Sequence, residues 1–322
     1  MRTVKYLSPS SIRTWEEDRS EFYLRYLADE RPPRMPQTRP MAVGAAFDAF
    51  IKSKLVADLF GEKRPQFELK TIFEAQVEPH NRDWARLAGA HVYTQYVKSG
   101  ALTDLMLELS HAIHEPRFEL TVTDEVAIGE TVPVPLLGKP DVYFITRGGE
   151  HVIYDWKVNG YCSKSPTSPK PGYIMLRGEG RNCGKAHKSA QVINKGGIDV
   201  NVNHPINTVA ADWATQLAIY SWILGESVGA QFIAGIDQIV GGGMVDAACP
   251  LLRFATHRGH ISADWQKDLA SRIAGIWAQL QTPDPCGLGK ERMEVLDIYY
   301  KAYEPSGRSE ADEQWFKEIT RG

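Results

Sequence analysis

The chain has 322 residues, a length typical of one large domain or two small ones. Its 43% hydrophobic and 24% charged residues are ordinary for a globular protein, so a hydrophobic core of useful size can form. The net charge of −3 excludes a globally basic nucleic-acid-binding protein, and any evidence for such binding must come from local clusters of charge.

The cysteines and the apolar segments indicate where the protein works. The four cysteines lie far apart, without the two-residue gap of a zinc or redox motif: Cys162, Cys183, Cys249 and Cys286. Free thiols in a reducing compartment are the simplest interpretation. The N-terminus lacks the apolar run of a secretory signal, and no apolar stretch is long enough to span a bilayer. We therefore expect a cytoplasmic protein without a membrane partner.

The first third of the chain is predicted to be helical. Ser8 followed by Pro9 is typical of a helix start, and a run rich in aromatic and charged residues follows over 12–26. Further helices are expected over 41–59, 84–97 and 102–113.

The middle of the chain has the alternating polarity of strands, over 118–123, 132–137, 141–146 and 151–157. With a Gly148-Gly149 turn, these segments predict an antiparallel meander. A helix is expected over 213–224, strands over 231–240 and 251–256, and a last helix from Ser262 to about residue 280. This order predicts an α/β fold in which helices flank a central mixed sheet, and no clear linker divides it.

Two neighbouring expected strands carry the residues of chemical interest, Gly138-Lys-Pro-Asp141 and Tyr154-Asp-Trp-Lys157. Because strand side chains alternate between faces, Asp155 and Lys157 are expected on one face and Trp156 on the other. The glycine turn folds the strands side by side, so that two carboxylates and one ammonium can meet at one end of a hairpin.

This grouping suits the cleavage of a phosphodiester bond. Two carboxylates can hold a hard divalent cation such as Mg²⁺, which polarises the phosphoryl group and lowers the pKa of a water molecule. A nearby lysine can orient that water or stabilise the developing charge. The alternative is a surface hairpin with a salt bridge, because Asp-x-Lys alone is common. The preceding Pro-Asp and the apolar strands favour the functional interpretation.

The order of these motifs resembles the PD-(D/E)XK nuclease superfamily, and within it the RecB-like exonuclease branch. Four places match in order over roughly two thirds of the chain: Ser8-Pro-Ser-Ser-Ile12 with Phe22-Tyr-Leu-Arg-Tyr26; Gly44 with Asp48; Gly138 and Asp141 with Asp155 and Lys157; and Gln216 with Tyr220. The resemblance implies a restriction-endonuclease-like core within a single domain over 1–322. Its parts are a helical portion (1–115), a catalytic core (116–245) with a basic insertion (159–207), and a C-terminal strand and helix (246–322).

The resemblance also assigns roles to residues. It implies catalytic roles for Asp141, Asp155, Lys157 and Gln216, and metal binding by Asp48, Asp141 and Asp155. Asp48 stands where the branch has a histidine, and an aspartate can still bind a hard cation. The alternative for Asp48 is a solvated helix residue.

Some relatives hold an iron–sulfur cluster with four cysteines. The first of these would fall near Asp18-Arg19, and neither residue is a cysteine. No cysteine triplet follows Tyr220 either. We therefore expect Mg²⁺ or Mn²⁺ as the cofactor and no iron–sulfur cluster.

Gln216 and Tyr220 lie one helical turn apart, where the resemblance implies contact with the lysine or with a phosphate. The alternative is core packing for Tyr220 and helix surface for Gln216.

Between Asn159 and His204 seven basic residues outnumber two acidic ones, Glu179 and Asp199, which gives a local charge of +5 in an irregular segment.

We expect this basic segment to contact the DNA backbone and to become ordered on binding. The DNA-binding candidates are Tyr220, Lys164, Lys170, Arg177, Arg181, Lys185 and Lys188, with Tyr161 and Tyr173 available for base stacking. The alternative is a solvated loop.

His257 and His260 are expected in a surface turn, and Glu119 or Glu125 could add a carboxylate to the site.

These features predict a Mg²⁺- or Mn²⁺-dependent deoxyribonuclease. The resemblance favours an exonuclease, and the absence of a Gly-x-x-x-x-Gly-Lys loop excludes a built-in helicase motor. Such an enzyme suits DNA recombination in a phage or mobile element, beside a single-strand annealing protein and in the host cytoplasm.

Two alternatives stay open: a structure- or sequence-specific endonuclease on the same fold, and a non-catalytic DNA-binding adaptor. The intact Asp141, Asp155 and Lys157 argue against the adaptor, because buried like charges are unfavourable without a function.

Overall fold

The structure is a computed structural model that describes residues 1–30, 35–61, 64–118, 122–127, 133–243 and 249–302. The chain divides into two compact units. The first unit is formed from residues 1–35, 122–138 and 267–322, and the second from residues 36–121 and 139–266. Because both units are assembled from separate segments, no single linker in the sequence marks a boundary, and the predicted single domain stays a prediction.

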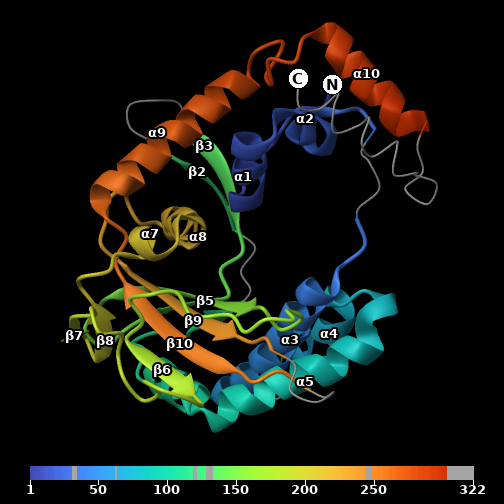
Figure 1. The fold of residues 1–322 in the computed structure, drawn as a ribbon. Coiled ribbons are helices and arrows are strands. Elements are labelled where there is room, and N and C mark those ends of the chain that lie inside the picture. Colours follow the sequence, from blue (N-terminus) through green and yellow to red (C-terminus); the bar gives the residue numbers. More distant parts are fainter. Residues whose placement is uncertain (31–34, 62–63, 119–121, 128–132, 244–248, 303–322) are drawn as a thin grey trace. The chain divides into compact units, whose positions relative to one another are not determined.

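A six-stranded mixed sheet forms the centre of the second unit (Figure 1). Its order is β1-β4-β5-β9-β10-β6; β5 and β9 are parallel, and the other neighbours are antiparallel. The strands are β1 (Arg117–Phe118), β4 (Val142–Ile145), β5 (His151–Asn159), β6 (Met175–Gly178), β9 (Ile233–Val240) and β10 (Arg253–Gly259). This architecture confirms the predicted α/β class with a mixed central sheet.

Helices cover both faces of this sheet. In Figure 1, α3, α4 and α5 lie on one side of β5 and β9, and α7 and α8 lie on the other. The helical elements of the second unit are α3 (Arg39–Phe60), η2 (Pro65–Phe67), α4 (Leu69–Gln76), η3 (Pro79–Asn81), α5 (Arg82–Lys98), α6 (Ala101–Ser110), α7 (Ile206–Val209) and α8 (Ala211–Ile223). The core forms where buried side chains of α3 and α5, among them Phe47 and Tyr96, pack on Tyr154 and Trp156 of β5.

The first unit contains helices and a two-stranded sheet. Its elements are α1 (Pro9–Glu17), α2 (Arg19–Phe22), the π-helix η1 (Tyr23–Leu27), β2 (Val122–Val126), β3 (Val134–Gly138), α10 (Lys290–Ala302) and most of α9 (Ala263–Leu280). Ser8 caps α1 as predicted: its hydroxyl accepts a hydrogen bond from Ser11 N at 3.2 Å, and Ser11 Oγ accepts one from Ser8 N at 2.7 Å. Asp18 ends α1 and caps α2, so the predicted run over 12–26 is divided into three pieces.

The predicted meander is wrong in one respect. Among the residues that the structure describes, β2 pairs with β3 alone in a separate sheet, whereas β4 pairs with β1 and β5. Between β3 and β4 the chain passes through Lys139 and Pro140, and a proline cannot donate a hydrogen bond to a continuing ladder. Helices α4 and α10 were not predicted.

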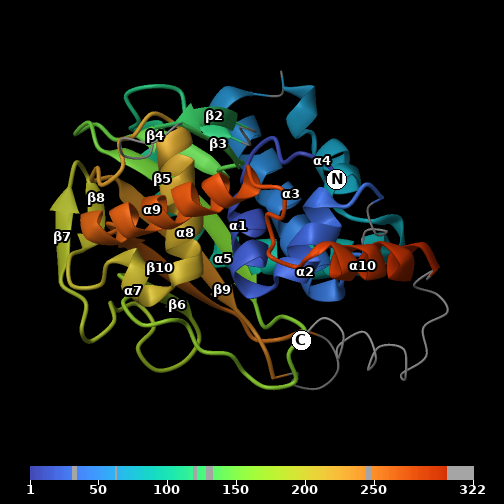
Figure 2. The ribbon, with the colours of Figure 1, turned by 90° about the horizontal axis from the view of Figure 1, so that it is seen from above.

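The basic segment over 159–207 is not irregular throughout, which corrects the expectation. It contributes β6 to the sheet edge and a hairpin formed by β7 (Val192–Lys195) and β8 (Ile198–Asn201). The hairpin turns at Gly196-Gly197, both in the left-handed region, and β8 lies near β10 (Figures 1 and 2). Among the described residues, no helix is long and apolar enough to cross a bilayer.

Candidate active site

The central strand β5 presents the predicted catalytic residues to one face of the sheet. Asp155 and Lys157 contact α8, whereas the indole of Trp156 points to the opposite face, where it packs on Phe47 and donates a hydrogen bond to the hydroxyl of Tyr96 at 3.3 Å. The alternation predicted from the sequence is therefore confirmed.

Asp141 lies opposite Asp155, because Val142 of β4 pairs in register with Tyr154 of β5. Its Oδ2 accepts a hydrogen bond from the backbone N–H of Trp156 at 3.3 Å. Burial and the negative charge of Asp141 together raise the pKa of Asp155 to about 7. Burial would also raise the pKa of Asp141, but the neighbouring Lys52 ammonium outweighs it and the pKa of Asp141 is lowered.

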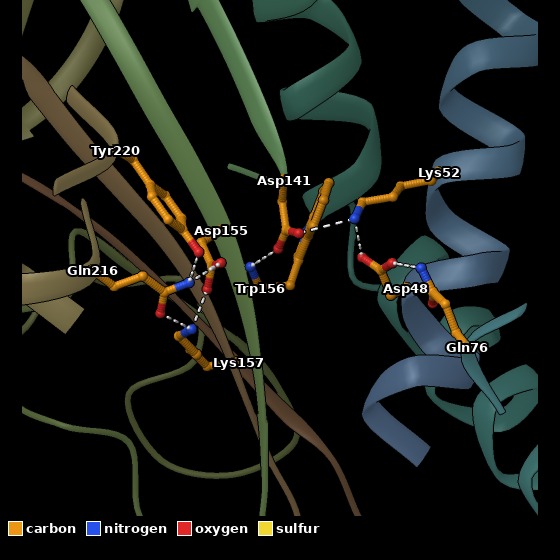
Figure 3. A network of polar contacts seen from close by, with 9 residues as sticks. All are labelled: Asp48, Lys52, Gln76, Asp141, Asp155, Trp156, Lys157, Gln216 and Tyr220. Atoms are coloured by element: carbon orange, nitrogen blue, oxygen red, sulfur yellow. Dashed lines mark hydrogen bonds and ion pairs between the residues drawn. The ribbon is translucent and has the colours of Figure 1, made fainter. Parts of the chain in front are cut away.

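Lys157, Gln216 and Tyr220 complete this side of the site (Figure 3). Lys157 Nζ lies 2.5 Å from Asp155 Oδ2 and donates to Gln216 Oε1 at 2.6 Å. Gln216 Nε2 donates to Asp155 Oδ1 at 3.0 Å and to the Tyr220 hydroxyl at 2.9 Å. The structure thus brings together five of the predicted residues: Asp141, Asp155, Lys157, Gln216 and Tyr220.

The charge state of Lys157 follows from these contacts. Burial lowers the pKa of its ammonium, but Asp155 and Asp141 more than compensate, so the pKa is raised and the group stays charged. Tyr220 is buried, and its pKa is raised by that burial. Its predicted contact with DNA stays a prediction, because the structure shows only its contact within the site.

On the other side of Asp141 lies a residue that the sequence did not single out, Lys52 of α3 (Figure 3). Its ammonium is 2.9 Å from Asp141 Oδ1 and 2.7 Å from Asp48 Oδ1. Asp48 Oδ2 accepts a hydrogen bond from Gln76 Nε2 of α4 at 2.9 Å. Burial raises the pKa of Asp48 to about 6, although Lys52 opposes the shift.

The sequence held one signal for Lys52. It is a lysine one turn after Asp48, in a helix whose neighbouring positions are apolar, and such a lysine needs a partner if it is buried. Gln76 carried no comparable signal, because α4 itself was not predicted.

The donors at this site fit a hard divalent cation. Asp141 and Asp155 offer carboxylate oxygens from adjacent strands. Asp155 Oδ2 is buried and lies 2.5 Å from Lys157 Nζ, and a carboxylate oxygen that contacts one ammonium still has a lone pair for a cation. Two carboxylates and several waters are a usual environment for Mg²⁺.

The three predicted metal ligands do not form one cluster. Of the residues that the structure describes, no three His, Cys, Asp or Glu side chains are grouped as metal ligands. Asp48 is separated from a shared site with Asp141 by the Lys52 ammonium that both carboxylates contact. The metal-binding role of Asp48 stays a prediction.

The predicted DNA-binding residues of the basic segment differ in their surroundings. Lys164, Arg181, Lys185 and Lys188 are exposed. Arg177 is half-buried, pairs with Asp104 and donates to the Ser99 carbonyl at 3.3 Å. Lys170 Nζ lies 5.5 Å from the centre of the Trp213 ring. The four exposed side chains are therefore the freest to contact a phosphate backbone.

Two aromatic residues expected to stack on bases are instead buried. Tyr161 packs against Trp84 and His91, and Tyr173 packs between His187 and His257. Because these rings are covered by protein, the prediction that they are available to bases is wrong.

His257 is also not in a surface turn, which corrects another expectation. It lies inside β10 with no exposed surface, beside Trp213, and its Nε2 is 3.3 Å from Gln238 Oε1. Burial lowers its pKa to about 3, so the imidazole is neutral. His260 is partly exposed and bonds to the Phe232 carbonyl at 2.7 Å.

The sequence also named two glutamates as candidates for a further carboxylate ligand. Glu125 is exposed on β2 of the first unit, and Glu119 lies outside the described residues. The N-terminal match at Ser8 also belongs to the first unit, where its observed role is to cap α1.

Comparisons with known proteins identify no family for this chain. Neither the protein-family models nor the curated proteins contain a match to this chain. A crystal structure of a protein designated SSO0001 aligns over 93% of this chain and 96% of that chain, with 12% sequence identity and a TM-score of 0.25. A TM-score this low carries no argument about fold or function, which therefore rest on the geometry described above.

Proposed function

We propose that the protein is a metal-dependent deoxyribonuclease that hydrolyses phosphodiester bonds. The observation that carries the proposal is the pairing of Asp141 with Asp155 on adjacent strands, with the Lys157 ammonium 2.5 Å from Asp155. Two neighbouring carboxylates can hold a hard divalent cation, and an ammonium beside them can stabilise charge on a phosphate.

Asp141 and Asp155 would hold a Mg²⁺ or Mn²⁺ ion. When bound there, such an ion supplies charge that polarises the phosphoryl group and lowers the pKa of a water nucleophile. Asp155 holds Lys157 in place by charge, and the lysine is positioned to donate to an oxygen that gains charge in the transition state.

Gln216 supports both catalytic side chains at once. Its amide nitrogen donates to Asp155 and its amide oxygen accepts from Lys157, so the two groups are held at a fixed separation before substrate arrives. The Tyr220 hydroxyl accepts a second hydrogen bond from the same nitrogen and fixes the orientation of the amide. This is the kind of preorganisation that lowers the barrier of a charged transition state.

DNA is the proposed substrate, and the exposed basic residues of the segment 159–207 are its proposed backbone contacts. The motif order favours an exonuclease that acts in DNA processing or recombination. A single-strand annealing protein is the partner that such an activity suggests.

The test is a cleavage time course on end-labelled linear DNA and on closed circular duplex, with Mg²⁺ or with EDTA. We expect shortening of the linear substrate that needs Mg²⁺, and resistance of the closed circle. Cutting of the circle would instead identify an endonuclease. Binding of DNA without cleavage in Mg²⁺ and in Mn²⁺ would contradict the enzyme and favour the adaptor.

A further inference from the structure

The contacts of Lys52 suggest a role that the proposed function does not include. Only 1% of its side chain is exposed, and its ammonium lies between the carboxylates of Asp48 and Asp141, at 2.7 and 2.9 Å. A buried ammonium is strongly unfavourable unless it is paired, and here two carboxylates from different elements pair with it. Lys52 therefore neutralises the negative charge on the α3 side of Asp141.

The ammonium also occupies the space that a metal ion would need. An ion that bridged Asp48 and Asp141 through their Oδ1 atoms would contact the same atoms that Lys52 contacts. Two cations cannot share that position, because of their size and mutual repulsion. The other oxygen of Asp141 points away from Lys52, toward the backbone of Trp156 on the β5 side (Figure 3).

We propose that Lys52 is a built-in cation that keeps Asp48 off the metal and confines a single divalent ion to Asp141 and Asp155. Asp48, held by Gln76 on its second oxygen, then positions Lys52 and does not coordinate the ion. This inference rests on the proposed function for the identity of the ion. It predicts that removal of Lys52 creates a third carboxylate ligand.

A second lysine on the same helix provides a matched control. Lys54 pairs with Asp58 at 2.6 Å, also one helical turn apart, but 48% of its side chain is exposed. A surface pair of this kind contributes little to stability and lies apart from the Asp141 carboxylate contacts. Lys54→Met therefore removes a lysine of α3 without changing the charge between Asp48 and Asp141.

The experiment measures Mn²⁺ binding by calorimetry, and thermal unfolding with and without Mn²⁺, on full-length protein stripped with EDTA. We expect Lys52→Met to bind Mn²⁺ about tenfold more tightly than wild type or to take up a second ion, because it exposes a carboxylate ligand. Without metal this variant should unfold at a lower temperature than wild type, and Mn²⁺ should restore it. The double variant Lys52→Met/Asp48→Asn should lose the gain in affinity, and Lys54→Met should match wild type.

Asp48→Asn tests the same claim in a variant that keeps Lys52. If Asp48 does not coordinate the ion, Asp48→Asn still binds Mn²⁺, with an affinity at most about a hundredfold below wild type, the range for loss of a supporting residue. Loss of all measurable Mn²⁺ binding would make Asp48 a ligand and overturn the inference. So would a Lys52→Met protein that folds and binds Mn²⁺ no more tightly than wild type.

These outcomes separate the inference from the proposed function. If wild type binds no Mn²⁺ but Lys52→Met does, Lys52 does keep Asp48 off a metal, but the metal site at Asp141 and Asp155 and the metal-dependent nuclease both fail. If neither protein binds Mn²⁺, the inference fails as well, because removal of Lys52 exposed no ligand.

Discussion

Two lysines lie on opposite sides of the same pair of aspartates, and their burial differs. Lys157 contacts Asp155 and keeps 23% of its side chain exposed, whereas Lys52 contacts Asp48 and Asp141 and is 1% exposed. An ammonium that solvent can reach is placed to meet a substrate phosphate, whereas a covered one can only balance charge. Residue type alone therefore does not decide which lysine can take part in catalysis.

The two sides are otherwise built alike. On each side a glutamine from a helix donates a hydrogen bond to a carboxylate that the lysine also contacts. Gln216 donates to Asp155 at 3.0 Å, and Gln76 donates to Asp48 at 2.9 Å. Gln216 also accepts a hydrogen bond from Lys157, the lysine of its own side. The exposed lysine is therefore held by a carboxylate and an amide, whereas the covered lysine is held between two carboxylates.

The largest expected effect comes from the two carboxylates that lie between the lysines, Asp141 and Asp155. Asp141→Ala or Asp155→Ala should abolish cleavage and weaken Mn²⁺ binding, because each removes a proposed ligand. Activity and calorimetry should be measured together, with the exposed Asp83→Ala of α5 as the control. Activity above about a tenth of wild type in either variant would refute the ligand assignment, since loss of a ligand should reduce the rate far more.

Lys157→Ala should separate chemistry from metal binding. We expect a loss of about a hundredfold or more in single-turnover cleavage, as for removal of a donor that stabilises transition-state charge. Mn²⁺ affinity should be retained, because an ammonium cannot coordinate an ion. Loss of Mn²⁺ binding in this variant would show that the catalytic role proposed for Lys157 is wrong.

Gln216→Ala should give a smaller effect on both quantities. This side chain holds Asp155 and Lys157 but is not itself a proposed ligand, and loss of such support typically costs about tenfold to a hundredfold in affinity or activity. Steady-state rates and Mn²⁺ calorimetry give the two readouts. Wild-type rates and wild-type Mn²⁺ affinity in this variant would show that Gln216 has no role in the site.

The pH dependence of metal binding should follow Asp155. Its pKa is raised to about 7, and a ligand carboxylate must lose its proton to bind the ion. Mn²⁺ affinity should therefore fall about tenfold for each pH unit below that pKa and level off above it. Asp141, whose pKa is lowered, stays ionised over this range and adds no second step. Calorimetry in matched buffers measures this profile, and a flat profile across neutral pH would remove Asp155 from the ligand set.

The smallest expected effect lies in the basic segment. Replacing Lys185 and Lys188 by alanine should reduce the slope of log affinity against log salt by up to about two, at roughly 0.9 per lost phosphate contact on duplex DNA. Chemistry on bound substrate should change little, because these lysines would position the backbone and not react. Affinity across a salt series, with single-turnover cleavage alongside, tests this. An unchanged slope would show that Lys185 and Lys188 do not contact the DNA backbone.

The sequence predicted those parts of the site that depend on short-range periodicity. The two-residue repeat of a strand placed Asp155 and Lys157 on one face, and the four-residue spacing of a helix placed Gln216 beside Tyr220. Lys52 was missed because its second partner, Asp141, is 89 residues away, and only the packing of α3 against β5 brings them together.

The fold shows the same limit. The long helices α3, α5 and α8 and the strands β5 and β9 were predicted, because their patterns persist over two or more turns or over several alternations. The short strands β6, β7 and β8 were missed, because four residues in a polar segment carry little pattern. The burial of His257 depends on its neighbours in space, Trp213 and Tyr173, which no local pattern reveals.

The most direct measurement is anomalous diffraction from crystals soaked in Mn²⁺. We expect one strong peak within coordination distance of carboxylate oxygens of both Asp141 and Asp155, with Lys52 still between Asp48 and Asp141. No peak at that pair after soaking, or a peak held by other residues, would show that these two aspartates do not form the metal site.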